Sequence, residues 1–136
     1  VFRRDDGVIV VDDSYNASPV ATATMLDLLA SSEGRRVAVL GEMYELGDLT
    51  ESAHRSVGEH AARACDLLLA VGGAAARTLA EAATRCGCAV VRHAEDAEQA
   101  ALVLASLIRP GDVVLVKGSR GVGLDRTVTA LTEGGR

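Results

Sequence analysis

Three short segments of the sequence carry the side chains best suited to chemistry. Residues 12–19 read Asp-Asp-Ser-Tyr-Asn-Ala-Ser-Pro, which places carboxylates, a phenol and an amide where they could hold a ribose or another polar substrate. Residues 117–121 read Lys-Gly-Ser-Arg-Gly and offer cations, a hydroxyl and accessible backbone donors, a combination that suits a carboxylate or a phosphate. Residues 41–47, Gly-Glu-Met-Tyr-Glu-Leu-Gly, are acidic, and their glycines permit close backbone approach; His54 follows them.

Each segment also has a purely structural interpretation. Asp13 and Ser18 could cap a turn and a helix start, while Asn16 takes a left-handed backbone conformation. The segment 41–47 could be a loop without a ligand, and the two cations of 117–121 could be solvated surface charges. The local chemistry of the segments leaves both interpretations open.

Several common kinds of site are missing from the sequence. No Gly-Lys-Ser/Thr ending of a phosphate-binding loop occurs in 118–127, and no stretch matches the dinucleotide-binding glycine fingerprint in full. His54, His60 and His93 lie far apart in the sequence, so each is interpreted as a surface or core histidine. We therefore assign neither a metal nor a catalytic residue to this chain.

Composition limits the class of protein. The 136 residues are 49% hydrophobic but include one Phe, two Tyr and no Trp. The core must therefore consist of Val, Leu and Ala, which favours an α/β fold.

A formal net charge of -5 provides no basic field for nucleic acid. No apolar run reaches the roughly 18 residues needed to cross a bilayer, and no charged-then-apolar leader opens the chain. With three cysteines that lack the spacing of a redox or zinc pair, these features predict one cytoplasmic domain with reduced thiols at Cys65, Cys86 and Cys88.

The hydrophobic pattern predicts strands that alternate with helices. The apolar runs expected to form strands are 8–11, 37–40, 66–71, 89–91 and 113–116. The Ala- and Leu-rich stretches expected to form helices are 19–31, 49–64, 74–85, 97–108 and 122–133. Such a series gives a Rossmann-like, doubly wound, mostly parallel sheet of five or six strands with helices on both faces. The first residues add an antiparallel edge strand through the turn at 5–7, and binding groups gather at the carboxyl ends of the parallel strands.

Capping residues locate some of the helix ends. Ser18 before Pro19 is a good pair of N-cap and first helical residue. Asp96 with Gln99 resembles a capping box, and Gly87 is suited to end the third helix. The ends predicted in this way agree with the hydrophobic pattern.

The three segments, taken in order, resemble the Mur ligases. The parts of the sequence that carry the resemblance are 12–19, 40–47 with His54 and Gly58 after it, and 116–121. Within the family, Tyr-Asn-Ala at 15–17 and Lys-Gly-Ser-Arg-Gly at 117–121 favour the branch that adds D-alanyl-D-alanine. The positions that depart from the residues usual in the family are Ser18, Glu42, Val122 and Leu124.

The resemblance implies an ATP-dependent amide ligase of bacterial cell-wall (peptidoglycan) precursor synthesis with three domains, of which 1–136 would be the C-terminal one. The implied reaction joins D-alanyl-D-alanine to UDP-N-acetylmuramoyl-tripeptide, with ATP and Mg²⁺ held mainly by a central domain that this chain lacks. This chain would contact the central domain, close over the nucleotide and position the dipeptide. We expect a cytoplasmic monomer without membrane insertion. We expect no ligation by the isolated chain. The chain looks like an excised fragment because it begins inside a predicted strand or hairpin.

The resemblance also implies roles for residues of the first and last segments. Those expected to contact the nucleotide or the reacting centre are Asp12, Asp13, Tyr15 and Asn16. Those expected to bind D-alanyl-D-alanine are Asn16, Ser18, Lys117, Ser119 and Arg120. The last segment is assigned to the carboxylate of the dipeptide because Arg can grip a carboxylate with two parallel hydrogen bonds.

Three alternatives remain at this point. A sister Mur ligase or a folylpolyglutamate ligase would share the fold and bind another amino acid. A signalling receiver domain would also have paired acids after its first strand and a lysine after its last. It needs a phosphorylatable Asp at the end of the third strand, however, where residues 69–73 read Leu-Ala-Val-Gly-Gly. A bare interaction domain would perform no chemistry.

Overall fold

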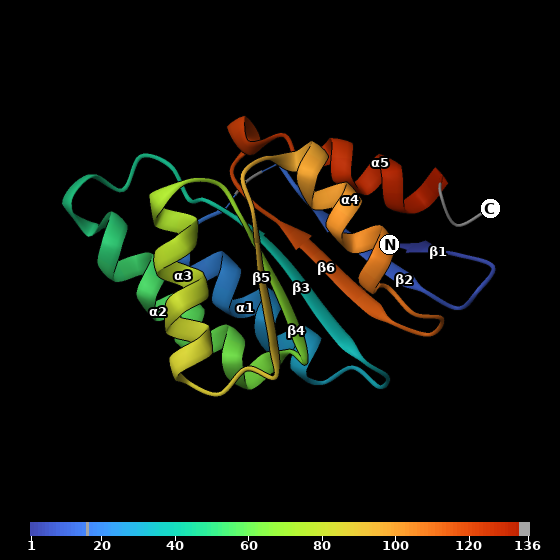
Figure 1. Cartoon of the computed structure of the whole chain (residues 1–136). Helices are drawn as coiled ribbons and strands as arrows, with labels where there is room; N and C mark the ends of the chain where they lie inside the picture. The colour runs from blue at the N-terminus through green and yellow to red at the C-terminus, as the bar shows by residue number, and fades with distance from the viewer. Residues whose placement is uncertain (16, 134–136) are drawn as a thin grey trace.

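Strands and helices alternate along the chain in a computed structural model of the protein (Figure 1), which describes residues 1–15 and 17–133. The strands are β1 Phe2–Arg3, β2 Ile9–Asp13, β3 Arg36–Gly41, β4 Leu67–Val71, β5 Val90–Ala94 and β6 Val113–Lys117. The α-helices are α1 Pro19–Ala30, α2 Thr50–Ala64, α3 Ala74–Arg85, α4 Ala97–Leu107 and α5 Asp125–Glu133. Short 3-10 turns occur at η1 Gly47–Leu49 and η2 Arg120–Val122.

The strands form one sheet in the order β1-β2-β6-β3-β4-β5. β1 pairs antiparallel with β2, and the other pairings are parallel. These pairings confirm the predicted α/β fold and its antiparallel edge strand. Because β6 lies between β2 and β3, the residues that follow these three strands emerge side by side.

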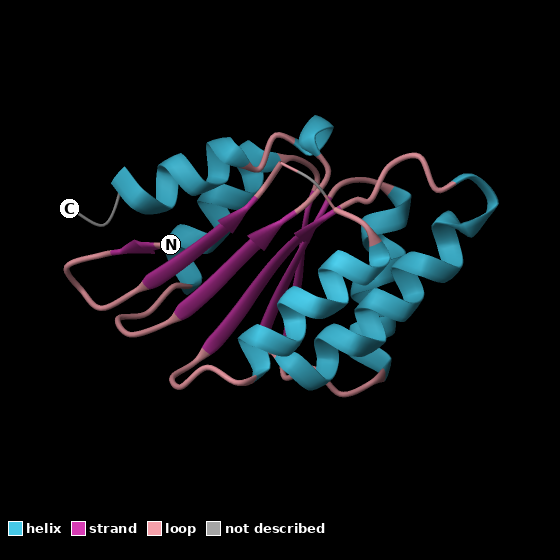
Figure 2. Ribbon diagram, turned by 180° about the vertical axis from the view of Figure 1, so that it is seen from behind, coloured by secondary structure: helices cyan, strands magenta, loops and turns pink. Residues whose placement is uncertain are grey.

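Helices cover both faces of the sheet, α1, α2 and α3 on one and α4 and α5 on the other (Figures 1 and 2). Successive strand residues point to opposite faces, so Ala38 and Leu40 pack with α1 to α3 while Val37 and Val39 pack with α4 and α5. Each fully buried Val or Leu side chain stabilises the fold by roughly 1.5–3 kcal/mol. Among the described helices, none combines the length and apolar character that a bilayer crossing requires.

The helix ends follow the capping residues, with two differences. The Ser18 side chain accepts from Ala21 N and starts α1, as predicted. Asp96 accepts from Gln99 N at 2.8 Å, but the Gln99 side chain reaches back to Glu95 N instead of completing the box at Asp96. The last helix begins at Asp125, not at 122, because Gly123 takes a left-handed φ of 75° that ends the preceding 3-10 turn.

Candidate functional site

The loops that follow β2, β6 and β3 meet at the carboxyl edge of the sheet. In the parallel pairing of β2 with β6, Asp13 lies opposite Lys117. In the pairing of β3 with β6, Leu40 also lies opposite Lys117. The three chemistry-bearing segments of the sequence are therefore neighbours in space, although as many as 104 residues separate paired side chains.

Lys117 and Asp13 form an ion pair at the centre of this edge. Lys117 Nζ donates to Asp13 Oδ2 at 2.6 Å, with the lysine side chain 3% and the aspartate side chain 38% exposed. Lys117 is therefore not a solvated surface charge, and its contact with Asp13 directs the ammonium towards the 12–15 segment. This ion pair joins the first and last candidate segments.

The 12–15 segment is a turn ordered by its own side chains. Asp12 Oδ1 accepts from Ser14 N at 3.0 Å, a short-range bond typical of Asp in turns. Tyr15 projects outward and is 63% exposed. Asn16, which the resemblance assigned to both ligands, lies outside the described residues. Ser18 is the N-cap of α1, as its structural interpretation predicts, and the Asp13 carboxylate pairs with Lys117.

The acidic loop at 42–46 is attached to α2 by His54, which is fully buried. His54 Nε2 lies 3.0 Å from Met43 N and accepts its hydrogen bond. Nδ1 lies 2.6 Å from the Thr50 carbonyl oxygen. Because an amide N–H donates and a carbonyl oxygen accepts, the ring must be neutral with its proton on Nδ1. His54 is thus a core histidine with a defined task, holding this loop against the helix.

The same loop is joined to the 117–121 segment by Ser119. Ser119 Oγ accepts from Tyr44 N at 2.9 Å, and Ser119 N donates to the Glu42 carbonyl at 3.2 Å. Burial and the charge of Glu42 raise the pKa of Tyr44, which keeps its phenol protonated. Ser119 therefore connects two loops, and its hydroxyl is already engaged within the protein.

Glycines allow the two loops to touch. A Cβ on Gly118 would lie 3.1 Å from Gly41 Cα and 2.8 Å from Leu124 Cδ1. A Cβ on Gly121 would lie 2.6 Å from Tyr44 Cε2. A Cβ at either position would therefore push the Leu124 or Tyr44 side chain aside, so glycine allows the loops their present close approach.

A pocket of about 330 Å³ opens between the first and last segments. The residues that line it are Ser14, Tyr15, Arg120, Gly121, Gly123, Asp125 and Arg126. Ser14 is 2% exposed, and its buried Oγ has no hydrogen-bond partner in the described part of the chain. Arg120 and Arg126 add two cationic residues to this lining. Such an arrangement can hold an anionic oxygen.

The pocket contains some of the expected site residues and adds others. Tyr15 and Arg120 line it, whereas Lys117 and Ser119 face protein partners. Ser14 and Arg126 were missed by reasoning from the sequence. Ser14 stands inside the first motif but looks like an ordinary turn residue, and Arg126 falls within a predicted helix, where a lone arginine gives no signal.

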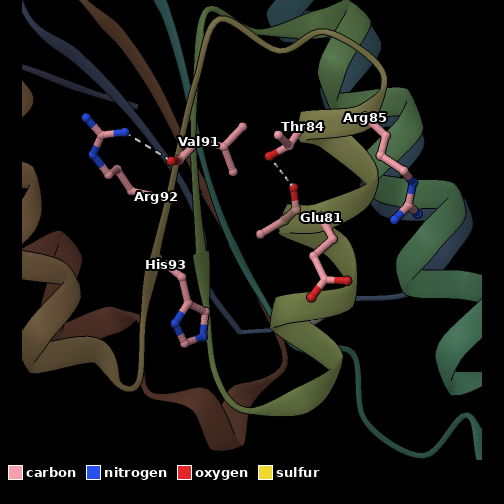
Figure 3. A pocket seen from close by; sticks show the side chains of 7 residues that line it. Glu81, Thr84, Arg85, Val91, Arg92 and His93 are labelled. Atoms are coloured by element: carbon pink, nitrogen blue, oxygen red, sulfur yellow. Dashed lines mark hydrogen bonds between the residues drawn. The ribbon is translucent and has the colours of Figure 1, made fainter.

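A second hollow, of about 430 Å³, lies between α3 and the edge strand β5 (Figure 3). Its polar side chains include Glu81, Arg85 and Arg92. His93 also lines it, and its Nε2 lies 2.6 Å from the Gly72 carbonyl oxygen. β5 is at the opposite end of the sheet from β2, so this hollow does not belong to the site formed by the three loops.

Sequence comparison identifies the family. Residues 1–120 match the family described as Mur ligase, glutamate ligase domain. The chain belongs to the Mur ligase family. A Mycobacterium tuberculosis relative named UDP-N-acetylmuramoyl-tripeptide--D-alanyl-D-alanine ligase is 36% identical over 152 residues, covering 96% of this chain and 30% of the relative. An Escherichia coli relative of the same name is 37% identical over 130 residues, covering 93% and 27%. The chain thus spans less than a third of the length of these relatives.

Solved structures of Mur ligases share the fold. MurF ligase from Thermotoga maritima in complex with ADP has a TM-score of 0.81 and 32% sequence identity, over 96% of this chain and 29% of that chain. A MurF structure from Acinetobacter baumannii has a TM-score of 0.83 and 27% identity, over 93% and 28%. This chain is therefore a MurF-like C-terminal domain of the Mur ligases, which are ATP-dependent amide ligases.

Proposed function

We propose that this chain is the C-terminal, third domain of the ligase that joins D-alanyl-D-alanine to UDP-N-acetylmuramoyl-tripeptide in the cytoplasm. The names of the relatives support this assignment, and so does the arrangement of the three loops. In this proposal the rest of a monomeric enzyme, outside 1–136, holds most of the nucleotide. The chain by itself then lacks the groups needed for ligation.

The observation that carries the proposal is the pocket at the carboxyl edge of the sheet, which Arg120 and Tyr15 both line. Open parallel sheets bind ligands at this edge. An arginine can hold the carboxylate of a small peptide with two hydrogen bonds. An exposed tyrosine at the rim offers an aromatic face and a hydroxyl to a nucleotide or a reacting group brought by another domain.

The loops around the pocket give it the rigidity that positioning requires. Lys117 with Asp13, Ser119 with Tyr44, and His54 with Met43 join the three loops into one unit. In this proposal Lys117 and Ser119 hold the loop that presents Arg120. This role differs from the direct contact with the dipeptide that the resemblance implied for them. Asp12 orders the turn that presents Tyr15, and Asp13 reaches the reacting centre only together with Lys117.

The residues of this chain suit a supporting role towards ATP and Mg²⁺. Tyr15 and the half-exposed Asp13 lie where they could contact a nucleotide held mainly by the central domain. When bound, ATP with Mg²⁺ supplies the phosphoryl group that activates the terminal carboxylate of the tripeptide. This domain then closes over the nucleotide, excludes water, and holds the dipeptide with its amine facing that carboxylate.

Phosphate release tests the proposal. The full-length protein would be incubated with ATP, Mg²⁺ and UDP-N-acetylmuramoyl-tripeptide, with and without D-alanyl-D-alanine, beside the 136-residue chain. We expect dipeptide-dependent release from the full-length protein and none from the chain alone. Release that depends on a different amino acid would assign the chain to a sister ligase, and no release at all would contradict the proposal.

A further inference from the structure

We infer that Cys65 and Cys88 are a reversible modification site, where a low-molecular-weight disulfide oxidises the two thiols to an intramolecular disulfide. The cysteines of the chain are free thiols in the structure. Cys65 follows α2 and Cys88 follows α3, so the pair lies at the amino ends of β4 and β5. This place is at the opposite edge of the sheet from the three loops, and the inference does not depend on what those loops bind.

The pairing of β4 with β5 brings the two cysteines together. These strands are parallel, and their first paired residues are Leu67 and Val90. Cys65 and Cys88 each stand two residues before that pair, at equivalent positions of neighbouring segments. The contact continues towards them, because Val90 N donates to the Asp66 carbonyl oxygen at 3.3 Å. Neighbouring strands lie about 4.8 Å apart, which is within the Cα separation of roughly 4.4–6.8 Å that a disulfide spans.

The two side chains share one layer of the core. Cys65 is buried among the residues that pack with α1 to α3, and Cys88 packs against the same cluster. Cys88 Sγ lies 3.9 Å from the Cys65 carbonyl oxygen. Each thiol also shifts the pKa of the other, as expected for side chains in direct contact. A bond between the two sulfur atoms therefore needs no change in the pairing of the strands.

The thiols differ in exposure and acidity, which sets the order of the reaction. Cys65 is 6% exposed, whereas Cys88 is partly exposed and can meet a dissolved reagent. The interaction with Cys65 lowers the pKa of Cys88 to about 7, so at neutral pH much of it is thiolate, the form that attacks a disulfide. The interaction with Cys88, followed by burial, raises the pKa of Cys65. Capping the Cys88 sulfur removes the first of these causes, so Cys65 then loses its proton more easily.

Two exchange steps complete the reaction. The Cys88 thiolate attacks one sulfur of the external disulfide, whose S–S bond breaks and releases one thiolate. Cys65 gives its proton to that thiolate, and its sulfur attacks Cys88 Sγ. This step forms the internal S–S bond and releases a second thiolate, which takes up the proton that Cys88 had lost to water. The two protein thiols are thus oxidised, and the external disulfide is reduced to two thiols.

The internal disulfide links the end of α2 to the turn that precedes β5. The linked residues are 23 positions apart and enclose β4 and α3. Such a cross-link removes conformational freedom from the opened chain, so oxidation should stabilise this part of the sheet. Amide hydrogen exchange at 88–91, beside the bond, should slow by about tenfold.

The experiment uses oxidised glutathione as the external disulfide and the full-length protein in a Cys86→Ser background. After oxidation, the remaining thiols are blocked with N-ethylmaleimide and the protein is digested with trypsin. Cleavage after arginine places Cys65 in the peptide 64–77 and Cys88 in the peptide 86–92. We expect mass spectrometry to find these two peptides joined by a disulfide and to find them separate after reduction with dithiothreitol. Exchange at 88–91 that stays the same on oxidation would contradict the stabilising effect.

The matched control is Cys88→Ser, which retains Cys86 in the same tryptic peptide. Cys86 is exposed, so it should take up glutathione, but the yield of peptides joined to Cys65 should be at least about tenfold lower than in Cys86→Ser. Equal yields would mean that the bond forms in opened chains and would overturn the inference. A Cys88 that stays linked to glutathione in Cys86→Ser would overturn it as well.

Thermal unfolding of each variant checks that it folds. If Cys86→Ser did not fold, the unaltered protein would take its place. Fragmentation of the joined peptides would then identify the linked cysteine, and a bond from Cys65 to Cys86 would contradict the inference.

Discussion

Asp13 and Lys117 form an ion pair in which the cation is buried. The Lys117 ammonium is buried, and the Asp13 carboxylate lies 2.6 Å away. Burying a charge is costly unless it is paired. We expect Asp13→Asn to lower the free energy of unfolding by about 1–3 kcal/mol, measured by urea denaturation of the chain.

The neighbouring aspartate provides the control for this effect. Asp12 makes its turn bond through a side-chain oxygen, and Asn would retain that oxygen. Asp12→Asn should therefore leave stability nearly unchanged. If the two substitutions had equal effects, the buried ion pair would not be the cause.

Cys88 should be the thiol whose reactivity depends on a neighbour. The interaction with the neighbouring Cys65 side chain lowers the pKa of Cys88 to about 7. The interaction with Cys88, together with burial, raises the pKa of Cys65. In a Cys86→Ser background, alkylation of Cys88 by iodoacetamide should therefore rise with a midpoint near pH 7 while Cys65 stays unmodified, as followed by mass spectrometry.

Replacing the neighbouring thiol tests the cause. Cys65→Ala removes the neighbouring thiol that lowers the pKa of Cys88, so the alkylation midpoint should move to higher pH, towards that of an ordinary thiol. A midpoint that stays in place would show that Cys65 does not set the reactivity of Cys88.

At the scale of elements, one side chain of α2 determines the position of the loop after β3. His54 accepts from Met43 N and contacts the Thr50 carbonyl. His54→Phe would leave both backbone groups without these bonds, at a cost of about 1–3 kcal/mol. We expect faster amide hydrogen exchange at Met43 and Tyr44, measured by mass spectrometry.

His60, on the same helix, is the matched control. Its ring contacts Asp27 at 2.7 Å, but the Asp27 side chain is 71% exposed. His60→Phe should therefore leave exchange in the 42–46 loop unchanged. Equal acceleration in both variants would mean that α2 as a whole, and not the His54 bond, restrains this loop.

At the scale of the whole molecule, a buried carboxylate lies at the ends of the strands that are farthest from the pocket. Asp112 is 1% exposed and precedes β6. It accepts from Arg35 at 3.1 and 2.9 Å and from Arg109 N at 2.9 Å. Removing one partner of a buried ion pair is strongly destabilising, so Asp112→Ala should cost about 3 kcal/mol, measured by denaturant unfolding.

The consequence for binding differs from the consequence for stability. The pocket lies beyond the other ends of the strands, so the folded Asp112→Ala protein should bind ligand as before. Glu95→Ala is the control, because its pair with Arg77 has side chains 58% and 51% exposed and should contribute at most about 1 kcal/mol. Similar losses in the two variants would contradict the importance of burial.

Most of the fold could be predicted because its strands are buried and parallel. Runs of Val, Leu and Ala mark β3, β4 and β6, which lie inside the sheet. β5 extends to Ala94, beyond the predicted 89–91, because Arg92 and His93 interrupt the apolar run. β5 is an edge strand, where polar side chains are tolerated, so hydrophobicity underestimates its length.

The sequence predicts where in the fold the site lies, but not which of its side chains contact each other. Strand ends indicate where ligands bind, and Tyr15 and Arg120 do line the pocket. The pairing of Lys117 with Asp13 depends on the register of β2 against β6, which no local pattern encodes. The burial of Ser14 likewise results from packing between distant segments, so its unpartnered hydroxyl becomes visible only in three dimensions.

The contact between Gly41 and Gly118 restricts how this protein can diverge. A Cβ on either residue would lie within 3.3 Å of the other's Cα, and no residue is smaller than glycine. A larger residue at one position therefore forces the other loop to move by a few tenths of an ångström, and no smaller residue at the other position can make room for it. Directed libraries that aim to change the ligand should leave both glycines fixed and vary the lining of the pocket instead.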